Sequence, residues 1–135
     1  MDTATKTREK KATGSLQQMG DFFGKLYSFN TSLKLYHWHV TGKGSYAQHI
    51  ALDQAIESLT DVLDRVVETS YSKYGEVNVT VPETDVPRDI VEHAEKFYAY
   101  VEDQRELFSE DFTDSRIDDY QEGIQQLLYR LKRLQ

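Results

Sequence analysis

The chain has 135 residues, a length typical of one domain. Hydrophobic residues make up 39% and charged residues 29%, which allows a modest core and argues against intrinsic disorder. No apolar run approaches the roughly 18 residues of a membrane span, and the polar N-terminus does not resemble a secretory signal. The sequence has no cysteine, which excludes disulfides, thiolate metal sites and cysteine nucleophiles and favours a reducing, cytoplasmic location.

The net charge is −7, and it is unevenly distributed. Residues 1–14 contain four basic and two acidic residues, so they carry +2 and leave −9 for the rest. We interpret residues 1–14 as a flexible basic arm and residues 15–135 as one folded domain. The acidic domain favours cations over nucleic acids, whereas the arm is either a solvated tail or a contact for DNA phosphates.

Four segments repeat apolar residues every three or four positions, which predicts amphipathic helices. They cover about residues 15–40, 45–74, 85–110 and 113–135, and Ser15 is the expected N-cap of the first. Glycines at positions 42 and 44 predict a tight turn between the first two helices. Gly20 and Gly24 lie one turn apart, which predicts close approach of a neighbouring helix.

Residues 76–83 break the helical pattern. Val77, Val79 and Val81 alternate with polar residues, which is the period of an extended strand. One strand has no partner in a helical chain, so we interpret this segment as an extended crossover between the second and third helices. Two helical hairpins joined in this way predict an all-α, ferritin-like antiparallel four-helix bundle with one crossover connection.

Two histidines flank the first predicted turn at equal distances. His37 lies six residues before Lys43 and His49 lies six residues after it, so an antiparallel hairpin brings both imidazoles to one level. Asp53 follows His49 by one helical turn and lies on the same side of the second helix. Because the chain lacks cysteine, any metal is held by His, Asp and Glu. These three residues are therefore a candidate metal site.

Asp64 and Glu68 continue the same polar stripe of the second helix. Asp53 and Asp64 are separated by eleven residues, about 16 Å along a helix axis. Metal–ligand bonds are about 2 Å long, so one straight helix cannot bring both groups to one ion. A second copy running antiparallel across a two-fold axis brings Asp64 and Glu68 to His37, His49 and Asp53. The spacing thus predicts two metal sites per dimer, each shared between copies.

Residues 35–42, LYHWHVTG, and the spacing of the five candidate ligands resemble the signature of the Dps-type mini-ferritins. The resemblance implies a ferritin-like bundle, usually assembled as a hollow cage of twelve copies. It also implies an iron-oxidising site shared between two subunits. By position, it implies metal-binding and catalytic roles for His37, His49, Asp53, Asp64 and Glu68.

Two imidazoles and three carboxylates suit a divalent first-row metal. The resemblance implies that peroxide, or oxygen more slowly, is the oxidant; peroxide accepts two electrons, so iron is oxidised in pairs. We expect a ferroxidase that stores iron (Fe²⁺/Fe³⁺) and protects against peroxide damage. We also expect the chain to form a homo-oligomer with copies of itself and to make no membrane contact. Two alternatives stay open: a DNA-binding or structural cage protein with the mini-ferritin fold, and a metal-binding shell without turnover.

Other polar and aromatic residues have expected positions. His39 lies about 200° around the helix from His37 and is expected at the surface or an interface. His93 is expected to be exposed. Trp38 is either close to the iron, as the resemblance implies, or a helix-packing aromatic. Glu57 and Asp61, between the two half-sites, form a solvated acidic face or assist the passage of ions.

Overall fold

The computed structural model describes residues 3–108 and 111–133, with side chains for residues 16–108 and 113–133. Within these ranges the chain is helical and contains no strand. Its elements are α1 (Thr3–His39), α2 (Ser45–Tyr74), α3 (Ile90–Gln104), the short 3₁₀ helix η1 (Arg105–Leu107) and α4 (Asp111–Arg133). The predicted all-helical chain with four helices is confirmed.

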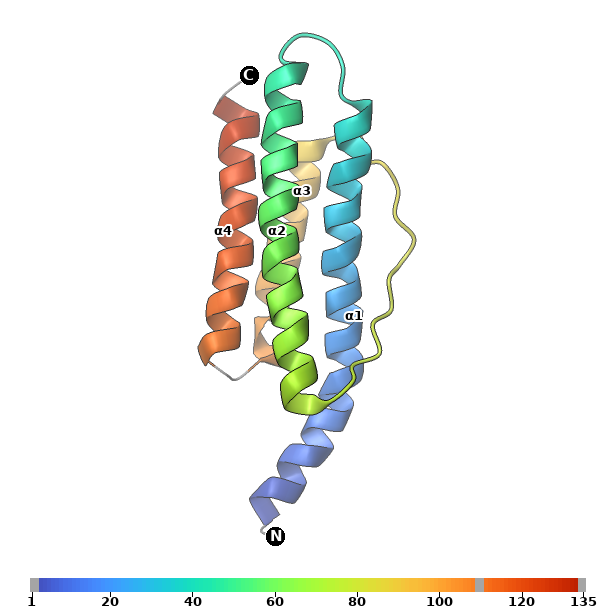
Figure 1. The fold of residues 1–135 in the computed structure, drawn as a ribbon, viewed down its shortest axis with the longest axis vertical. Coiled ribbons are helices and arrows are strands. Elements are labelled where there is room, and N and C mark those ends of the chain that lie inside the picture. Colours follow the sequence, from blue (N-terminus) through green and yellow to red (C-terminus); the bar gives the residue numbers. More distant parts are fainter. Residues whose placement is uncertain (1–2, 109–110, 134–135) are drawn as a thin grey trace.

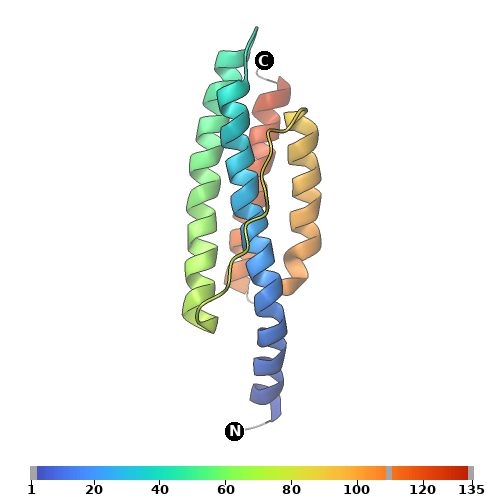
Figure 2. The ribbon, with the colours of Figure 1, turned by 90° about the vertical axis from the view of Figure 1, so that its right-hand side faces the viewer.

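The four helices lie side by side as a bundle (Figure 1). α2 packs against both α1 and α4, and α3 packs against α4 and α1. α1 and α2 run in opposite directions, and so do α3 and α4 (Figure 1). Residues 75–89 instead run back along α1, so α3 starts at the end of the bundle where α2 starts (Figure 2).

Glycines with positive φ lie in the α1–α2 turn and at the end of α2. Gly42 and Gly44 have φ values of 89° and 80° in the α1–α2 turn, a region that costs glycine little. Gly75, with φ of 85°, ends α2 and donates its N–H to the Tyr71 carbonyl at 2.9 Å. The predicted bounds of the second helix, residues 45–74, are therefore confirmed.

The predicted apolar stripes form the core. Each fully buried large apolar side chain contributes about 1.5–3 kcal/mol relative to exposure. A polar pair crosses this core, because the Tyr120 hydroxyl donates to Asn30 Oδ1 at 2.6 Å. Burial raises the pKa of Tyr120 well above its ordinary value, so it remains a donor. The most deeply buried side chains include Leu33, Leu52, Leu59, Ile124 and Leu127; Leu134, which the pattern also places in the core, lies outside the described residues.

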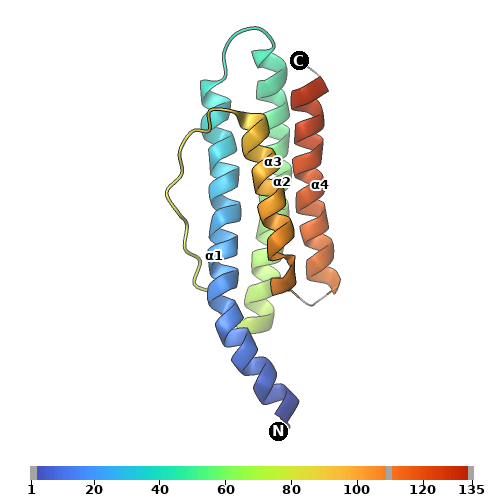
Figure 3. The same ribbon diagram turned by 180° about the vertical axis from the view of Figure 1, so that it is seen from behind.

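α1 is longer than the sequence analysis predicts. It begins at Thr3 rather than near Ser15, and its first turns extend past the end of the bundle (Figure 3). Residues 3–14 contain no proline, and seven of the twelve are lysine, arginine, glutamate or alanine, which favour helix. Ser15 consequently lies inside α1, so its prediction as an N-cap is wrong. The division into an arm of residues 1–14 and a domain of residues 15–135 stays a prediction.

The connection of residues 75–89 packs tightly on α1 (Figure 2). As predicted, residues 76–83 are neither helix nor paired strand. A Cβ added at Gly24 would lie 1.6 Å from the Thr80 carbonyl oxygen, and one at Gly20 would lie 2.0 Å from the Asn78 oxygen. The close approach predicted at the two glycines is therefore present, but its partner is this connection and not a helix.

The bounds of the third helix differ from the prediction. α3 begins at Ile90 rather than near residue 85, because the Asp89 carboxylate caps it by accepting the Glu92 N–H at 3.0 Å. α3 ends at Gln104 rather than near residue 110. After η1, Phe108 is extended and buries its ring beside Phe22, with ring centroids 5.7 Å apart. Burial of this ring favours leaving the helix before residue 110.

Candidate metal centre

The α1–α2 turn brings three of the predicted ligands together. His37 lies in the last turn of α1, His49 near the start of α2, and Asp53 one turn further along α2. One ligand atom from each residue lies within 4.8 Å of the others. Among the residues whose side chains are described, this is the one group of three or more His, Asp or Glu with metal-site spacing. The predicted association of these three residues is thus present.

The Asp53 carboxylate faces both imidazoles. Its Oδ1 lies 2.9 Å from His37 Nε2, and its Oδ2 lies 3.8 Å from His49 Nε2. The two imidazole rings lie against each other, with centroids 3.6 Å apart and planes inclined by 30°. Each carboxylate oxygen therefore approaches a different ring nitrogen, and the three donors converge on one small volume.

His37 is the buried member of this cluster. Its residue is 6% exposed, and neither ring nitrogen has a hydrogen-bond partner. Although His37 Nε2 is close to Asp53, the two groups are not aligned for a hydrogen bond. A buried polar atom left unpaired costs about 1–3 kcal/mol of folding free energy. A partner that accepts the lone pair of a His37 nitrogen would remove this cost. A metal cation is such a partner.

Positive charge also gathers around Asp53. Lys34 Nζ lies 3.6 Å from Asp53 Oδ1, and its ammonium is 6.0 Å from the centre of the Trp38 ring. Desolvation by neighbouring groups raises the pKa of Asp53, but the short His37 contact and the charges of Lys34 and the histidines lower it more. The net effect holds the pKa of Asp53 below its ordinary value, so the carboxylate is ionised and ready to bind a cation at neutral pH.

The donor set suits a first-row divalent metal with open positions. Two histidines and one carboxylate on one side of an ion are the ligands typical of non-haem ferrous sites. Two ligand atoms bound to one ion at about 2 Å lie at most about 4 Å apart. Here the three ligand atoms lie within 4.8 Å of one another, so the side chains need to close in by less than about 1 Å to hold an ion. The residues present therefore fit a metal ion.

Asp64 and Glu68 do not join this cluster within one chain. Both are exposed on α2, and Asp64 lies eleven residues beyond Asp53, about 16 Å along the helix axis. They border an apolar pocket of about 200 Å³ between α1, α2 and the connection. Their participation in a shared site stays a prediction.

The neighbouring aromatic and histidine residues divide into confirmed and corrected positions. Trp38 is 66% exposed, so it is not a packing aromatic within the chain. His39 is exposed, as predicted. The prediction that His93 is exposed is wrong: its ring stacks on Phe29 at 5.2 Å, and its Nε2 is 2.7 Å from Ser32 Oγ.

The periodicity of α3 contains the signal that places His93. This histidine lies three residues after Ile90 and four before Phe97, so it falls on the apolar stripe of the helix. The acidic residues on either side of it in the sequence lie on other faces of α3. Burial lowers the pKa of His93, which favours the neutral ring.

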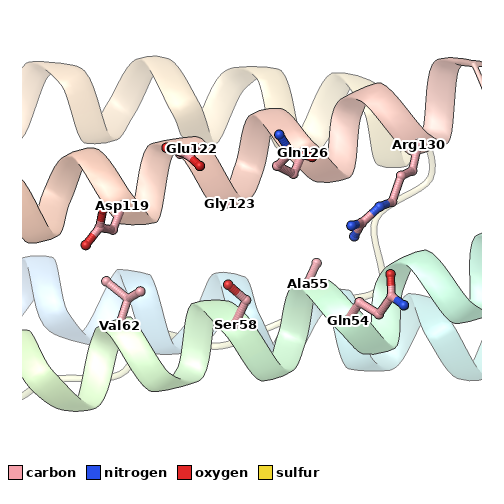
Figure 4. A pocket seen from close by; sticks show the side chains of 9 residues that line it. All are labelled: Gln54, Ala55, Ser58, Val62, Asp119, Glu122, Gly123, Gln126 and Arg130. Carbon is pink, nitrogen blue, oxygen red and sulfur yellow. The ribbon is translucent and has the colours of Figure 1, made fainter.

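A second hollow of about 360 Å³ lies between α2 and α4, which pack against each other (Figure 4). Asp119 and Glu122 line one end, Arg130 lines the other, and Ser58 faces Gly123 between them. The hollow holds no histidine, so it lacks the mixed donor set found at the α1–α2 turn.

No helix in the described part of the chain is long and apolar enough to cross a membrane. Neither a curated protein nor a solved structure matches the chain. Residues 37–131, which begin at the buried histidine and include all five predicted ligands, match a family of unknown function, DUF5856. Since the match covers more than half of the chain's length, this chain belongs to the DUF5856 family.

Proposed function

We propose that this protein is a ferritin-like ferroxidase that oxidises and stores iron at sites shared between two copies of the chain. The observation that carries the proposal is the buried His37, whose unpaired nitrogens lie beside His49 and the ionised Asp53. Such a two-histidine, one-carboxylate set is typical of ferrous sites with open coordination positions. Ferrous iron is thus the substrate, and these side chains are its first binding groups.

The path of the chain supports the ferritin-like part of this proposal. Two helical hairpins joined by one long connection are the arrangement of ferritin-like bundles. In this chain the long connection is residues 75–89, which lie along α1 (Figure 2). The resemblance of residues 35–42 to the Dps-type mini-ferritins points to the same class and to a cage of twelve copies.

A second copy completes the site in this proposal. Asp64 and Glu68 are exposed on the same face of α2 as Asp53, so they are available to another chain. With α2 antiparallel to its symmetry mate, the two acids of one copy lie opposite His49 and Asp53 of the other. A dimer then holds two sites about 22 Å apart.

The side chains divide the chemical work. His37 and His49 bind the ferrous ion through ring nitrogens, while the carboxylates favour the ferric product because their negative charge stabilises the higher oxidation state. Two ferrous ions each lose one electron, and one peroxide accepts both electrons and two protons to give two water molecules. The acidic body of the chain, with −9 outside residues 1–14, attracts the cations to the protein.

The rate of iron oxidation, monitored by absorbance, tests this function. The wild type is compared with Asp64→Ala plus Glu68→Ala, with Asp118→Ala plus Asp119→Ala as a control that removes the same charge from α4. We expect the first variant to lose at least a tenfold factor in rate, as losses of metal-site groups commonly do, while the control keeps it. Equal rates in the wild type and the first variant would reject the site assignment.

A gel-shift assay separates this function from the alternative of a DNA-binding cage. The arm of residues 1–14 is the basic part of the chain, and phosphate contacts weaken steeply with salt. Retardation of DNA at low salt together with no iron oxidation would favour the alternative. Iron oxidation without retardation supports the ferroxidase.

A further inference from the structure

α2 leaves three large apolar side chains exposed. Tyr46 is 78% exposed, Ile50 37% and Tyr71 39%. At about 100° per residue, all three fall within about 60° of one another around α2, and Asp53 and Asp64 lie in the same sector. We name this sector the α2 outer face; no element of the described part of the chain covers its exposed side chains.

An apolar pocket opens beside the α2 outer face. Its volume is about 200 Å³, and Asp64 and Glu68 border it. The remaining lining residues are apolar or aromatic and come from α1, α2 and the connection: Phe23, Tyr27, Leu63, Val67 and Val79. An exposed apolar pocket next to exposed apolar side chains indicates a docking surface.

The register required by the shared metal site pairs these features. Placing His49 opposite Glu68 and Asp53 opposite Asp64 matches residues whose numbers add to 117. The same register places Tyr46 opposite Tyr71 and Ile50 opposite Val67, because each pair also adds to 117. The apolar pairs did not enter the choice of register, so their agreement is an independent observation.

We propose that a second copy of this chain covers the α2 outer face and that Ile50 of each copy inserts into the apolar pocket of the other. Tyr46 of each copy packs against Tyr71 of its partner at the two ends of the contact. The register, though not the apolar surface, rests on the proposed function. Ile50 is thereby the residue that sets the alignment of the two helices, and so the meeting of the two half-sites.

The middle of the α2 outer face opposes this pairing. It carries Asp53, Glu57, Asp61, Asp64 and Glu68, of which Asp61 is paired with Arg65 at 3.2 Å. Lys34 of the neighbouring α1 lies 3.6 Å from Asp53 on this surface. Two such faces repel each other at low ionic strength, and salt or divalent cations weaken the repulsion. Pairing is therefore strengthened by the same cations that the shared sites bind.

Disulfide trapping tests the register directly, because the chain contains no cysteine. Ile50→Cys combined with Val67→Cys is oxidised in metal-free buffer at high salt, and the products are separated on a non-reducing gel. Disulfides need Cβ atoms about 3.5–4.5 Å apart. Because the proposed register places residue 50 of one copy opposite residue 67 of the other, we expect this pair to form a covalent dimer. The control, Ile50→Cys with Tyr71→Cys, is shifted by one helical turn and should stay monomeric on the gel.

Equal trapping in both pairs, or none in either while circular dichroism shows folded protein, would overturn the proposed docking. A second measurement is the dimer dissociation constant, obtained by sedimentation. Ile50→Asp is expected to raise this constant at least tenfold more than Tyr129→Asp on α4 does. Equal sedimentation of the two variants also contradicts the proposal.

A charge variant separates this inference from the proposed function. Asp64→Asn plus Glu68→Gln, added to the Ile50→Cys and Val67→Cys pair, removes four acids from a dimer and should increase trapping at low salt. The same change should abolish iron oxidation. If trapping persists while wild-type protein oxidises no iron, the docking stands and the proposed function fails; if oxidation depends on the acids but no trapping occurs, the docking fails.

Discussion

His37 Nε2 lies 2.9 Å from Asp53 Oδ1, although the two residues come from different helices on either side of the α1–α2 turn. This contact joins a buried imidazole to a half-exposed carboxylate without an aligned hydrogen bond. Buried polar atoms whose role is only structural are normally hydrogen-bonded. Their unpaired state is the reason for assigning a metal-binding role to this end of the bundle.

Replacement of the buried imidazole should have opposite effects with and without metal. His37→Leu removes two unpaired buried nitrogens, so the metal-free protein should gain about 1 kcal/mol in free energy of unfolding. The rise in Tm that Co²⁺ causes in the wild type should disappear, because binding to the folded state is lost. Thermal melts with and without Co²⁺ measure both effects. His39→Leu, at an exposed position, is the control; an unchanged Co²⁺ shift in His37→Leu would contradict the site.

Removal of the nearby lysine charge should strengthen metal binding. Lys34 Nζ lies 3.6 Å from the Asp53 carboxylate and competes with a cation for it. An exposed ion pair of this kind is worth about 0.2–1 kcal/mol, so Lys34→Gln should tighten Co²⁺ binding by up to about fivefold. Calorimetric titration gives the affinities. Lys25→Gln removes the same charge about 13 Å away along α1 and should change the affinity little; weaker binding in Lys34→Gln would speak against the competition.

Substitution of Gly24 should displace the connection from α1. An added Cβ would meet the Thr80 carbonyl oxygen at 1.6 Å, and this backbone group cannot move without shifting the connection. Gly24→Ala should therefore lower the free energy of unfolding by about 1–3 kcal/mol. Gly123→Ala meets the flexible end of Leu59 at 2.7 Å and should cost less. Urea denaturation ranks the two variants, and an equal or reversed order would contradict the packing described for residues 75–89.

His93 should make the fold less stable in acid. Burial lowers its pKa from 6.5, so the folded state binds the proton less readily than the unfolded state. The free energy of unfolding is therefore unaffected by this group above pH 6.5 and falls as the pH drops through 6.5 toward the folded-state pKa. His93→Gln should reduce the stability difference between about pH 7.5 and about pH 5. Urea titrations at both values check this, with His39→Gln as the control; an undiminished difference would exclude His93 as the cause.

The local pattern was sufficient for α2 and for the three-residue cluster. Residues 45–74 lie between glycines that adopt positive φ, so the chain chemistry fixes both ends of the helix. The equal spacing of His37 and His49 about the turn then places their rings together, and the helical repeat adds Asp53. Each of these relationships depends on neighbours within a few residues or one hairpin.

Tertiary relationships account for the errors. The close approach at Gly24 involves Thr80, more than fifty residues away, and a small residue alone does not identify what lies against it. Phe108 leaves the helical path because its ring packs beside Phe22, a contact that the local sequence does not contain. The spacing of His93 to Ile90 and Phe97 places it on the apolar stripe of α3, although acidic residues flank it in the sequence.

Co-expression of two inactive variants tests the central claim, that two copies share each iron site. His49→Ala plus Asp53→Ala breaks one half-site, Asp64→Ala plus Glu68→Ala breaks the other, and each variant alone should oxidise iron slowly. Mixed dimers purified through a different tag on each variant contain one intact site and one broken on both sides. They should recover about half of the wild-type rate. Mixed dimers no faster than either parent would contradict a site built from two copies.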